Sequence, residues 1–393
     1  MKNAKLSSPE RYVALANVNN KTALIASRLI LLLSIALSLS FTARAEIDYL
    51  ETPAFLSDKA PSGLLLDIVN TGKHLVAVGE RGHIIYSADH GKNWQQASVP
   101  VYVTLTAVFF ISPDVGWAVG HEGVILHSTD AGKTWIRQLD GYQVNKQVIT
   151  QAQQLVHNKQ HQLQTVTDKD QHEEITYQLE EAGYALEEAI EDDQAGPFKP
   201  LLDVWFANEY QGYAVGAYGI LLQTLDGGEN WTLISNRLEN PEGFHLNSVA
   251  STPSGAIFIT GESGAIFRST NEGENWDRLT PPYEGSFFGI TSKGDSIVVF
   301  GLRGNIYRSR NNGDNWETVK TNANTTITAG MPTRSGLIVL VGNAGHVLFS
   351  KDQGKSFNVT VRADRLSLSA ITESTDHHLI AVGSRGVHKL ELP

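Results

Sequence analysis

The sequence predicts an all-β protein, a seven-bladed β-propeller with an inserted α-helical hairpin. Two repeated phrases predict this fold. The eight-residue phrase SADHGKNW (87–94) and its variants occur six times in all, and a strand-like phrase ending in G-x-x-G, such as VAVGERG (76–82), occurs seven times. The first glycines of the second phrase follow one another at steps of 41, 96, 45, 40, 41 and 41 residues. Four short strands in each unit of about 41 residues are typical of a propeller blade.

The chain begins with a segment typical of export. Lys21 and Arg28 precede a 13-residue apolar run (29–41), which is followed by an A-x-A site. These features predict a signal peptide over residues 1–45, cleaved after Ala45, with an uncleaved anchor as the alternative. We therefore expect an exported protein, located in the periplasm or an equivalent lumenal compartment, whose propeller spans residues 46–393.

Composition excludes several classes of function. Without the leader, residues 46–393 carry 25 basic and 41 acidic side chains, a net charge of −16. This balance argues against a nucleic-acid partner, because nucleic acids are bound by basic surfaces. The chain has no cysteine, which excludes disulfides, thiol catalysis and cysteine-ligated zinc.

Each unit is expected to contain four strands, a to d. Strand a begins the unit, strand b is the apolar run before G-x-x-G, strand c follows the second glycine, and strand d begins at the tryptophan. The glycines are expected to permit the positive φ of tight hairpin turns. The seventh unit stops at HKLELP without a strand d. Residues 46–56 are a candidate for this missing outer strand, which would join the two ends of the chain.

The eight-residue phrase resembles the Asp-box, S-x-D-x-G-x-x-W, of bacterial neuraminidase repeats. We expect a structural role, in which the acidic or amide side chain accepts hydrogen bonds from the turn and the aromatic ring packs between hairpins. Six copies of one catalytic group would not be needed by an enzyme. The residues assigned to this role are Asp89, Trp94, Asp130, Trp135, Asp226, Trp231, Asn271, Trp276, Trp316 and Asp352.

The one long step locates an insertion at 141–199, between blades 2 and 3. It is rich in Gln and Glu and has apolar residues at helical spacing on both sides of a break around 167–171, which predicts a helical hairpin. Three roles remain open. The hairpin is a docking arm for a partner, a cover packed on the propeller, or a lid whose acidic end competes for a basic surface.

The combination of VG-x-x-G with the Asp-box, repeated after a signal peptide, resembles the photosystem II stability and assembly factor family of lumenal propellers. This resemblance covers about 46–140 and 200–393. It implies a non-enzymatic, membrane-associated factor that helps to insert a reaction-centre subunit, with arginines in its G-x-R-G turns. Arg81, Arg303 and Arg385 match that pattern, whereas the other four turns carry no arginine. The resemblance implies no catalytic residue and no cofactor.

Propeller topology predicts a basic surface independently of the family. The b–c turns and d–a links open on one face, and the Asp-boxes open on the other. The first face would carry Arg81, Arg303 and Arg385 in the turns and Arg237, Lys320, Arg362 and Arg365 in the links. All of these except Arg237 belong to blades 5, 6, 7 and 1, where they would form a basic crescent. Such a crescent would bind acidic protein segments or anionic lipid headgroups, and the alternative is scattered, solvated arginines. The expected partner is an integral membrane or envelope protein complex, with peripheral association with a membrane.

The competing function is a sialidase-like glycoside hydrolase on the same scaffold. Sialidases require an arginine trio and a Tyr–Glu nucleophile pair, and the chain lacks the R-I-P stretch found near the start of sialidases. Asp67 and Asp203 on strands a are the acids expected near the channel. For metals, His157 and His161 have a suitable spacing but no evident third ligand, so no metal site is predicted.

Overall fold

The computed structural model describes residues 47–391, and in it each repeat folds into one antiparallel sheet. The predicted strand b is buried along its whole length in every blade, beginning with β2 (Leu75–Gly79). This strand lies between two neighbouring sheets and has no solvent-facing side, which explains its continuous apolar sequence.

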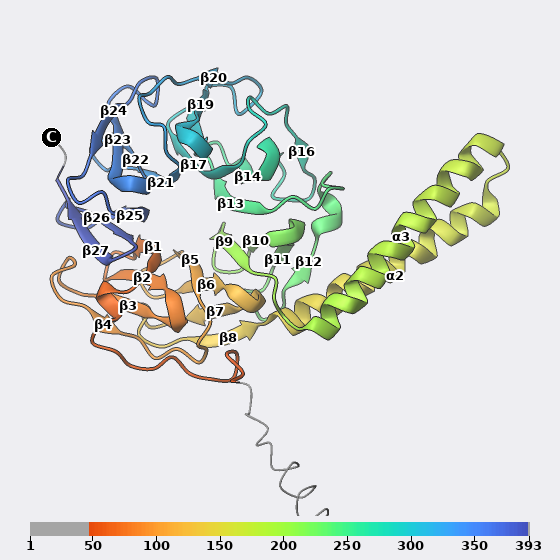
Figure 1. The fold of residues 1–393 in the computed structure, drawn as a ribbon, viewed down its shortest axis with the longest axis horizontal. Helices are drawn as coiled ribbons and strands as arrows, with labels where there is room; N and C mark the ends of the chain where they lie inside the picture. The colour runs from red at the N-terminus through yellow and green to blue at the C-terminus, as the bar shows by residue number, and fades with distance from the viewer. Residues whose placement is uncertain (1–46, 392–393) are drawn as a thin grey trace, which may run out of the picture. The chain divides into compact units, whose positions relative to one another are not determined.

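The strands of each blade follow one another in chain order from the centre of the ring outward (Figure 1). Blade 1 comprises β1 (Leu65–Asn70), β2, β3 (Ile84–Ser87) and β4 (Gln95–Gln96). Blade 2 comprises β5 (Leu105–Phe110), β6 (Gly116–Gly120), β7 (Ile125–Ser128) and β8 (Ile136–Leu139). Blade 3 comprises β9 (Leu201–Phe206), β10 (Gly212–Gly216), β11 (Leu221–Thr224) and β12 (Thr232–Leu233). Blade 4 comprises β13 (Leu246–Ser251), β14 (Ile257–Gly261), β15 (Ile266–Ser269) and β16 (Asp277–Arg278). Blade 5 comprises β17 (Phe287–Lys293), β18 (Ser296–Gly301), β19 (Ile306–Ser309) and β20 (Glu317–Thr318). Blade 6 comprises β21 (Ile327–Pro332), β22 (Ile338–Gly342), β23 (His346–Ser350) and β24 (Asn358–Val361). Blade 7 comprises β25 (Leu368–Glu373), β26 (Leu379–Gly383) and β27 (Gly386–Leu390).

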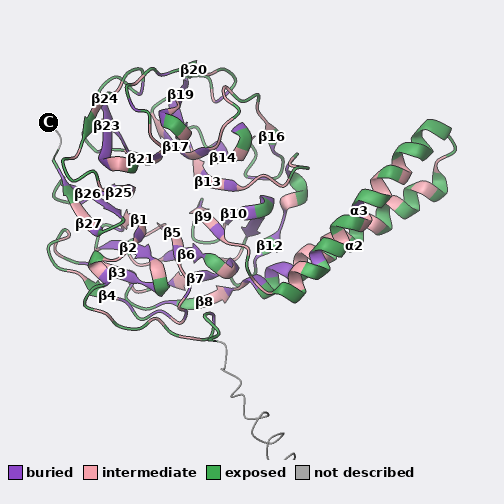
Figure 2. Ribbon diagram, in the orientation of Figure 1, coloured by how far each residue is buried: buried purple, intermediate pink, exposed green. Residues whose placement is uncertain are grey.

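The seven blades close into a ring. The innermost strand of each blade contacts the innermost strand of the next, and β25 of blade 7 contacts β1 of blade 1. The side chains between blades form the cores of the molecule, with the strand b residues at their centres (Figure 2). The predicted all-β, seven-bladed propeller is confirmed.

The expectation for the outer strand of blade 7 is wrong. Within residues 47–391, blade 7 has three strands, whereas the other six blades have four. The segment after residue 46 instead lies along blades 1 and 2, where the Ala54 N–H donates to the Val99 carbonyl (3.0 Å) and the Tyr102 N–H donates to the Tyr49 carbonyl (2.8 Å). Leu50 explains this position, because its side chain is buried in the core between blades 1 and 2.

The G-x-x-G turns work differently from the simple expectation. The first glycine is extended, as at Gly79 with φ −173°, and it is required because a Cβ there would lie 2.0 Å from the Leu64 carbonyl oxygen. The left-handed conformation falls instead on the second glycine and on the residue before it, such as Arg303 with φ 57°. The six turns that follow this pattern therefore hold a non-glycine residue in an unfavourable conformation.

The insertion forms two antiparallel helices, α2 (Gly141–Thr165) and α3 (Lys169–Ala195). Asp140 caps α2 by a reciprocal pair of hydrogen bonds with Gln143, and Asp168 caps α3, as acceptors before a first turn do. The hairpin extends outward from the ring (Figure 1). Among residues 47–391, no helix is long and apolar enough to cross a membrane.

Candidate binding surfaces

The Asp-box turns use their polar groups internally. In blade 1 the Ser87 hydroxyl donates to Asp89 Oδ1 (2.8 Å), the Gly91 N–H donates to the Ser87 hydroxyl (2.9 Å), and the Asn93 N–H donates to Asp89 Oδ1 (2.8 Å). The hydrogen bonds from Asn93, followed by that from Ser87, lower the pKa of Asp89 to about 2. The same bonds recur in the other five boxes, with Asn in place of Asp in two of them.

The aromatic residue of each box fixes the turn to the core. Trp135 is 4 % exposed, and its Nε1 donates to the Gly132 carbonyl at 3.0 Å. Trp231 and Trp276 are also buried, whereas Trp94 and Trp316 are half-buried. The carboxylates of the boxes are thus engaged by hydrogen bonds within their own turns, and their aromatic rings pack against the cores between blades.

Three predicted crescent residues lie exposed at the glycine turns. Arg81 is 64 % exposed at its side chain, and its only ion pair among the described residues is a 3.9 Å contact with neighbouring Glu80. Arg303 and Arg385 are exposed and form no ion pair within residues 47–391. These turns belong to blades 1, 5 and 7.

The residues from the d–a links divide into two groups. Arg365 is exposed beside the blade 6 turn, where its Cα lies against Gly345. Arg362 is occupied, because its guanidinium pairs with Asp364 and its Nη2 lies 3.4 Å from His388 Nδ1. Arg237 donates to the Gly273 carbonyl at 3.0 Å, in the Asp-box of the next blade.

The structure therefore leaves four arginines available on consecutive blades 5, 6, 7 and 1. We call Arg81, Arg303, Arg365 and Arg385 the arginine crescent. Lys320, from the link after blade 5, is also exposed. Sequence reasoning could not detect that Arg237 is occupied, because its acceptor comes from the next blade, whereas Asp364 lies only two residues from Arg362 and was a local signal for that pair.

The two channel acids join blades. Asp67 Oδ2 accepts the Val108 N–H of blade 2 (2.8 Å), and Asp203 Oδ2 accepts the Val249 N–H of blade 4 (2.9 Å). Burial raises the pKa of Asp67 to about 7, with a further contribution from the charge of Asp203. Burial also raises the pKa of Asp203 to about 6.

Both acids line the same cavity of about 200 Å³ at the centre of the ring. The remaining oxygens accept the N–H groups of Ile68 and Val204. No basic side chain is among the described residues that line this cavity, so the arginine trio of a sialidase has no counterpart there. The geometry favours a role in joining blades.

Among the described residues, the helical hairpin is attached to the ring at its base. Gln147 of α2 accepts the Leu233 N–H (2.8 Å) and donates to the Trp231 carbonyl (2.9 Å), both on the outer edge of blade 3. Lys199 forms a 2.5 Å ion pair with Asp192 at the end of α3. Beyond this base most residues of both helices are exposed or of intermediate burial (Figure 2). The cover interpretation therefore does not fit the distal part, which has the geometry of an arm.

The arm is strongly acidic on one helix. α3 carries ten acidic residues and one lysine. Tyr177 and Tyr184 of α3 are 60 % and 65 % exposed. They are seven residues apart and therefore lie on one side of the helix. His157 and His161 lie on α2, and no group of three or more His, Cys, Asp or Glu in residues 47–391 is arranged to hold a metal ion.

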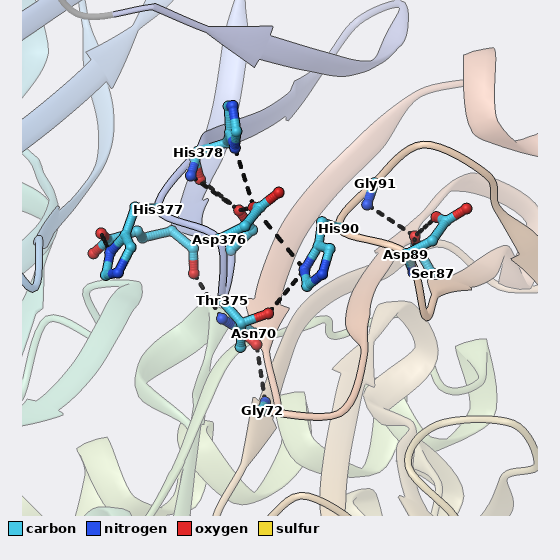
Figure 3. Close-up of polar contacts among 12 residues, drawn as sticks. Asn70, Gly72, Ser87, Asp89, His90, Gly91, Thr375, Asp376, His377 and His378 are labelled. Atoms are coloured by element: carbon cyan, nitrogen blue, oxygen red, sulfur yellow. Dashed lines mark hydrogen bonds and ion pairs between the residues drawn. The ribbon is translucent and has the colours of Figure 1, made fainter.

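Sequence reasoning missed one polar cluster, at the junction of blades 7 and 1 (Figure 3). The Thr375 hydroxyl lies 2.8 Å from His90 Nδ1, and His378 Nδ1 lies 3.1 Å from Asp376 Oδ1. The Ser374 hydroxyl hydrogen bond, together with the nearby histidines, lowers the pKa of Asp376. His90 and Thr375 lie 285 positions apart in the sequence and meet only where the ring closes. No local motif therefore signals the contact.

Comparisons with known proteins bear on this arrangement. The family profile described as "Photosynthesis system II assembly factor YCF48" matches residues 61–199 and 188–390. A curated relative, the photosystem II assembly lipoprotein Ycf48 of Synechococcus sp. (strain CC9902), is 34 % identical over 107 residues. That match covers 27 % of this chain and 31 % of the relative's length.

Solved structures share the fold at low sequence identity. The structure titled "YCF48 bound to D1 peptide" has a TM-score of 0.56 at 15 % identity, covering 87 % of this chain and 97 % of that chain. YCF48 from Cyanidioschyzon merolae has a TM-score of 0.55 at 16 % identity, covering 86 % and 97 %. The WD40 propeller of Doa1 has a TM-score of 0.56 at 9 % identity, covering 87 % and 95 %.

Proposed function

Because the chain belongs to the family described as photosynthesis system II assembly factor YCF48, we propose that it is a non-enzymatic assembly or scaffold factor for a membrane or envelope protein complex. It acts by binding a client and holding it in place, and it needs no cofactor. The exported location expected from the leader, which lies outside the described residues, places it where such clients expose their non-cytoplasmic segments.

The arginine crescent is the observation that carries this proposal. Its four guanidinium groups lie on consecutive blades, and only Arg81 has a carboxylate within 4 Å among the described residues. An arginine without a partner is available for bidentate pairing with a carboxylate. The surface therefore suits an acidic segment of a membrane protein, and anionic lipid headgroups offer a second contact for peripheral association with the membrane.

The arm supplies a second contact region. It is attached at blade 3, while the crescent spans blades 5, 6, 7 and 1, so the two regions lie on different sectors of the ring. The exposed tyrosines of α3 offer the large, amphipathic contact area that protein interfaces use. A client held at both regions would gain avidity from the shared scaffold.

A pull-down from detergent-solubilised membranes tests this function. The baits are wild type, the triple variant Arg81→Glu/Arg303→Glu/Arg385→Glu, and a variant lacking residues 142–196. This deletion is geometrically feasible because Gly141 and Pro197 lie in contact. We expect wild type to capture an integral membrane protein that at least one of the two variants loses.

A matched control places the same charge change on the opposite face. Lys133, Lys351 and Lys355 are exposed in Asp-box turns, and their triple substitution by glutamate should leave capture unchanged. Equal loss in this control would assign the effect to net charge and not to the crescent. Failure of every bait to capture a membrane protein would overturn the proposed function.

A further inference from the structure

The missing outer strand of blade 7 leaves an incomplete unit in an otherwise regular ring. In the first five blades, an apolar residue in or beside strand d shares a buried cluster with the Asp-box aromatic ring of the following blade. These pairs are Ala97 with Trp135, Leu139 with Trp231, Ile234 with Trp276, Leu279 with Trp316, and Val319 with Phe357. In the part of the chain that the structure describes, blade 7 has no strand d, and no residue of such a strand packs against Trp94 of blade 1.

A hollow of about 550 Å³ occupies the place of the missing side chains. Trp94, Ile380 and Val387 give it an apolar wall. Pro61 reaches it from the short helical turn Ala60–Ser62, which packs against Gly386 at the beginning of β27. The hollow has space for at least one additional apolar side chain, because a leucine or phenylalanine side chain is several-fold smaller than this volume.

The edge of β27 is open beside this hollow. Within residues 47–391, the backbone of β27 pairs with β26 and with no other strand. Gly383 and Gly386 face each other across a two-residue turn, and hydrogen-bonded and non-hydrogen-bonded pairs alternate from there. The register therefore directs the N–H and C=O groups of Val387 and Lys389 away from β26. An edge of this kind accepts a further strand.

The charges around the hollow select the occupant. Lys92 and Lys389 border it, and both are exposed. Its one carboxylate, Asp376, is already engaged by the Ser374 hydroxyl and by His378. The border therefore favours an acidic side chain over a basic one.

We propose that β27 and the adjoining hollow form a docking site for an extended, acidic and apolar segment of a partner protein, which adds as the fourth strand of blade 7. One apolar side chain of the segment enters the hollow against Trp94, and an acidic neighbour pairs with Lys92 or Lys389. The site goes beyond the proposed function, because it includes the Asp-box turn of blade 1, on the face opposite the arginine crescent.

A synthetic peptide tests the site directly. The probe is fluorescein-labelled Glu-Glu-Val-Thr-Val-Thr-Glu, whose Val-Thr-Val core copies strand d of blade 6. We expect saturable binding by fluorescence anisotropy, together with slower amide hydrogen exchange in 387–390. A peptide with lysine in place of each glutamate should bind at least about tenfold more weakly, which corresponds to about 1.4 kcal/mol.

Two protein variants make the prediction specific. Lys389→Pro removes one outward N–H without removing a bond to β26, and proline is tolerated at such edge positions, so peptide binding should weaken about tenfold or more. The charge reversal Lys92→Glu/Lys389→Glu should exchange the preference from the glutamate peptide to the lysine peptide. Arg303→Glu, on the other face, should change neither result.

Several outcomes would overturn the site. Peptide binding that survives both variants, no binding by wild type, or no protection in 387–390 would each do so. Protection of 387–390 in the unliganded chain that disappears when residues 1–46 are removed would assign the edge to the chain's own leader. A dimer that Lys389→Pro dissociates would assign it to a second copy. None of these results depends on whether a membrane client is captured through the crescent.

Discussion

At the residue scale, the same chemical group has different consequences in different repeats. Trp135, which follows a blade with a strand d, is buried, whereas Trp94, which follows blade 7, is half-buried. Trp316 is also half-buried, although the blade before it has a strand d. A carboxylate that accepts several turn N–H groups on the surface is held ionised, as at Asp89. A carboxyl group in the central channel has its pKa raised by burial, which favours the uncharged form, as at Asp67.

Truncation of the tryptophans should reveal this difference. Trp135→Ala should lower the free energy of unfolding by about 3–5 kcal/mol, because it leaves a cavity in the core between blades 1 and 2. Trp94→Ala should cost less, because its ring already adjoins a hollow. Urea unfolding followed by far-ultraviolet circular dichroism measures both values. Equal costs would contradict the assigned difference in packing.

The left-handed residues of the glycine turns offer a stabilising substitution. Ala344 has φ 53°, where a Cβ is unfavourable by roughly 1–2 kcal/mol. Ala344→Gly should therefore raise the free energy of unfolding by about 1 kcal/mol, after allowance for the greater freedom of glycine in the unfolded chain. Ala344→Val should have the opposite sign, because β-branched residues are the least tolerant of positive φ. A glycine variant less stable than wild type would refute the strain.

At the element scale, strands a are joined around the channel by side chains that reach the next blade. Asp67 and Asp203 accept backbone N–H groups, while Thr106 and Thr328 donate to the carbonyls of Leu201 and Leu368 at 2.7 Å each. Each bond connects one blade to its neighbour along the inner edge. The ring therefore does not depend on its outer strands alone for closure, which is consistent with the absence of one in blade 7.

The channel acids should give stability an unusual dependence on pH. The pKa values of Asp67 and Asp203 are raised to about 7 and about 6 in the folded state. Above about pH 4 the unfolded chain releases these two protons, whereas the folded state keeps them. The free energy of unfolding should therefore fall as pH rises from about 4 to 7. The double variant Asp67→Asn/Asp203→Asn should flatten this decline in urea midpoints. An unchanged slope would contradict the raised pKa values.

The helical hairpin is an element that should be separable from the propeller. Its contacts with the ring involve the base of α2, the end of α3 and the outer strand β12. Removal of residues 142–196 should leave the near-ultraviolet circular dichroism of the tryptophan-rich propeller unchanged and alter its urea midpoint little. A large loss of stability would show that the hairpin acts as a structural cover.

At the scale of the whole molecule, charge is distributed unevenly over a rigid ring. The arginine crescent occupies four consecutive blades, and the acidic helix α3 extends from blade 3. A negative net charge of the propeller would repel most acidic clients. The crescent therefore has to act locally, through short-range pairing and not through the long-range field.

Client binding through the crescent should consequently depend on salt. Raising the ionic strength from about 0.05 to 0.5 M shortens the screening length roughly threefold and should reduce capture of the membrane client by wild type. Capture by the triple arginine variant should fall little further at high salt, because the contribution of the crescent to capture has already been removed by the substitutions. Quantitative immunoblotting of the eluted client measures both. A salt response that is equal in the two proteins would place the electrostatic contact elsewhere.

The sequence by itself determined the repeat, the number of blades and the helical hairpin. These follow from local physics, because hydrophobic periodicity, glycine turns and capping residues act within a few positions along the chain. The tertiary structure alone decided that Arg237 is occupied, that residues 48–56 lie on blades 1 and 2, and that the edge of β27 is unpaired among the described residues. Those outcomes depend on contacts between residues far apart in sequence, such as Arg237 with Gly273 and Leu50 with the core around Trp135, and a local pattern contains no information about which distant group will fill a given space.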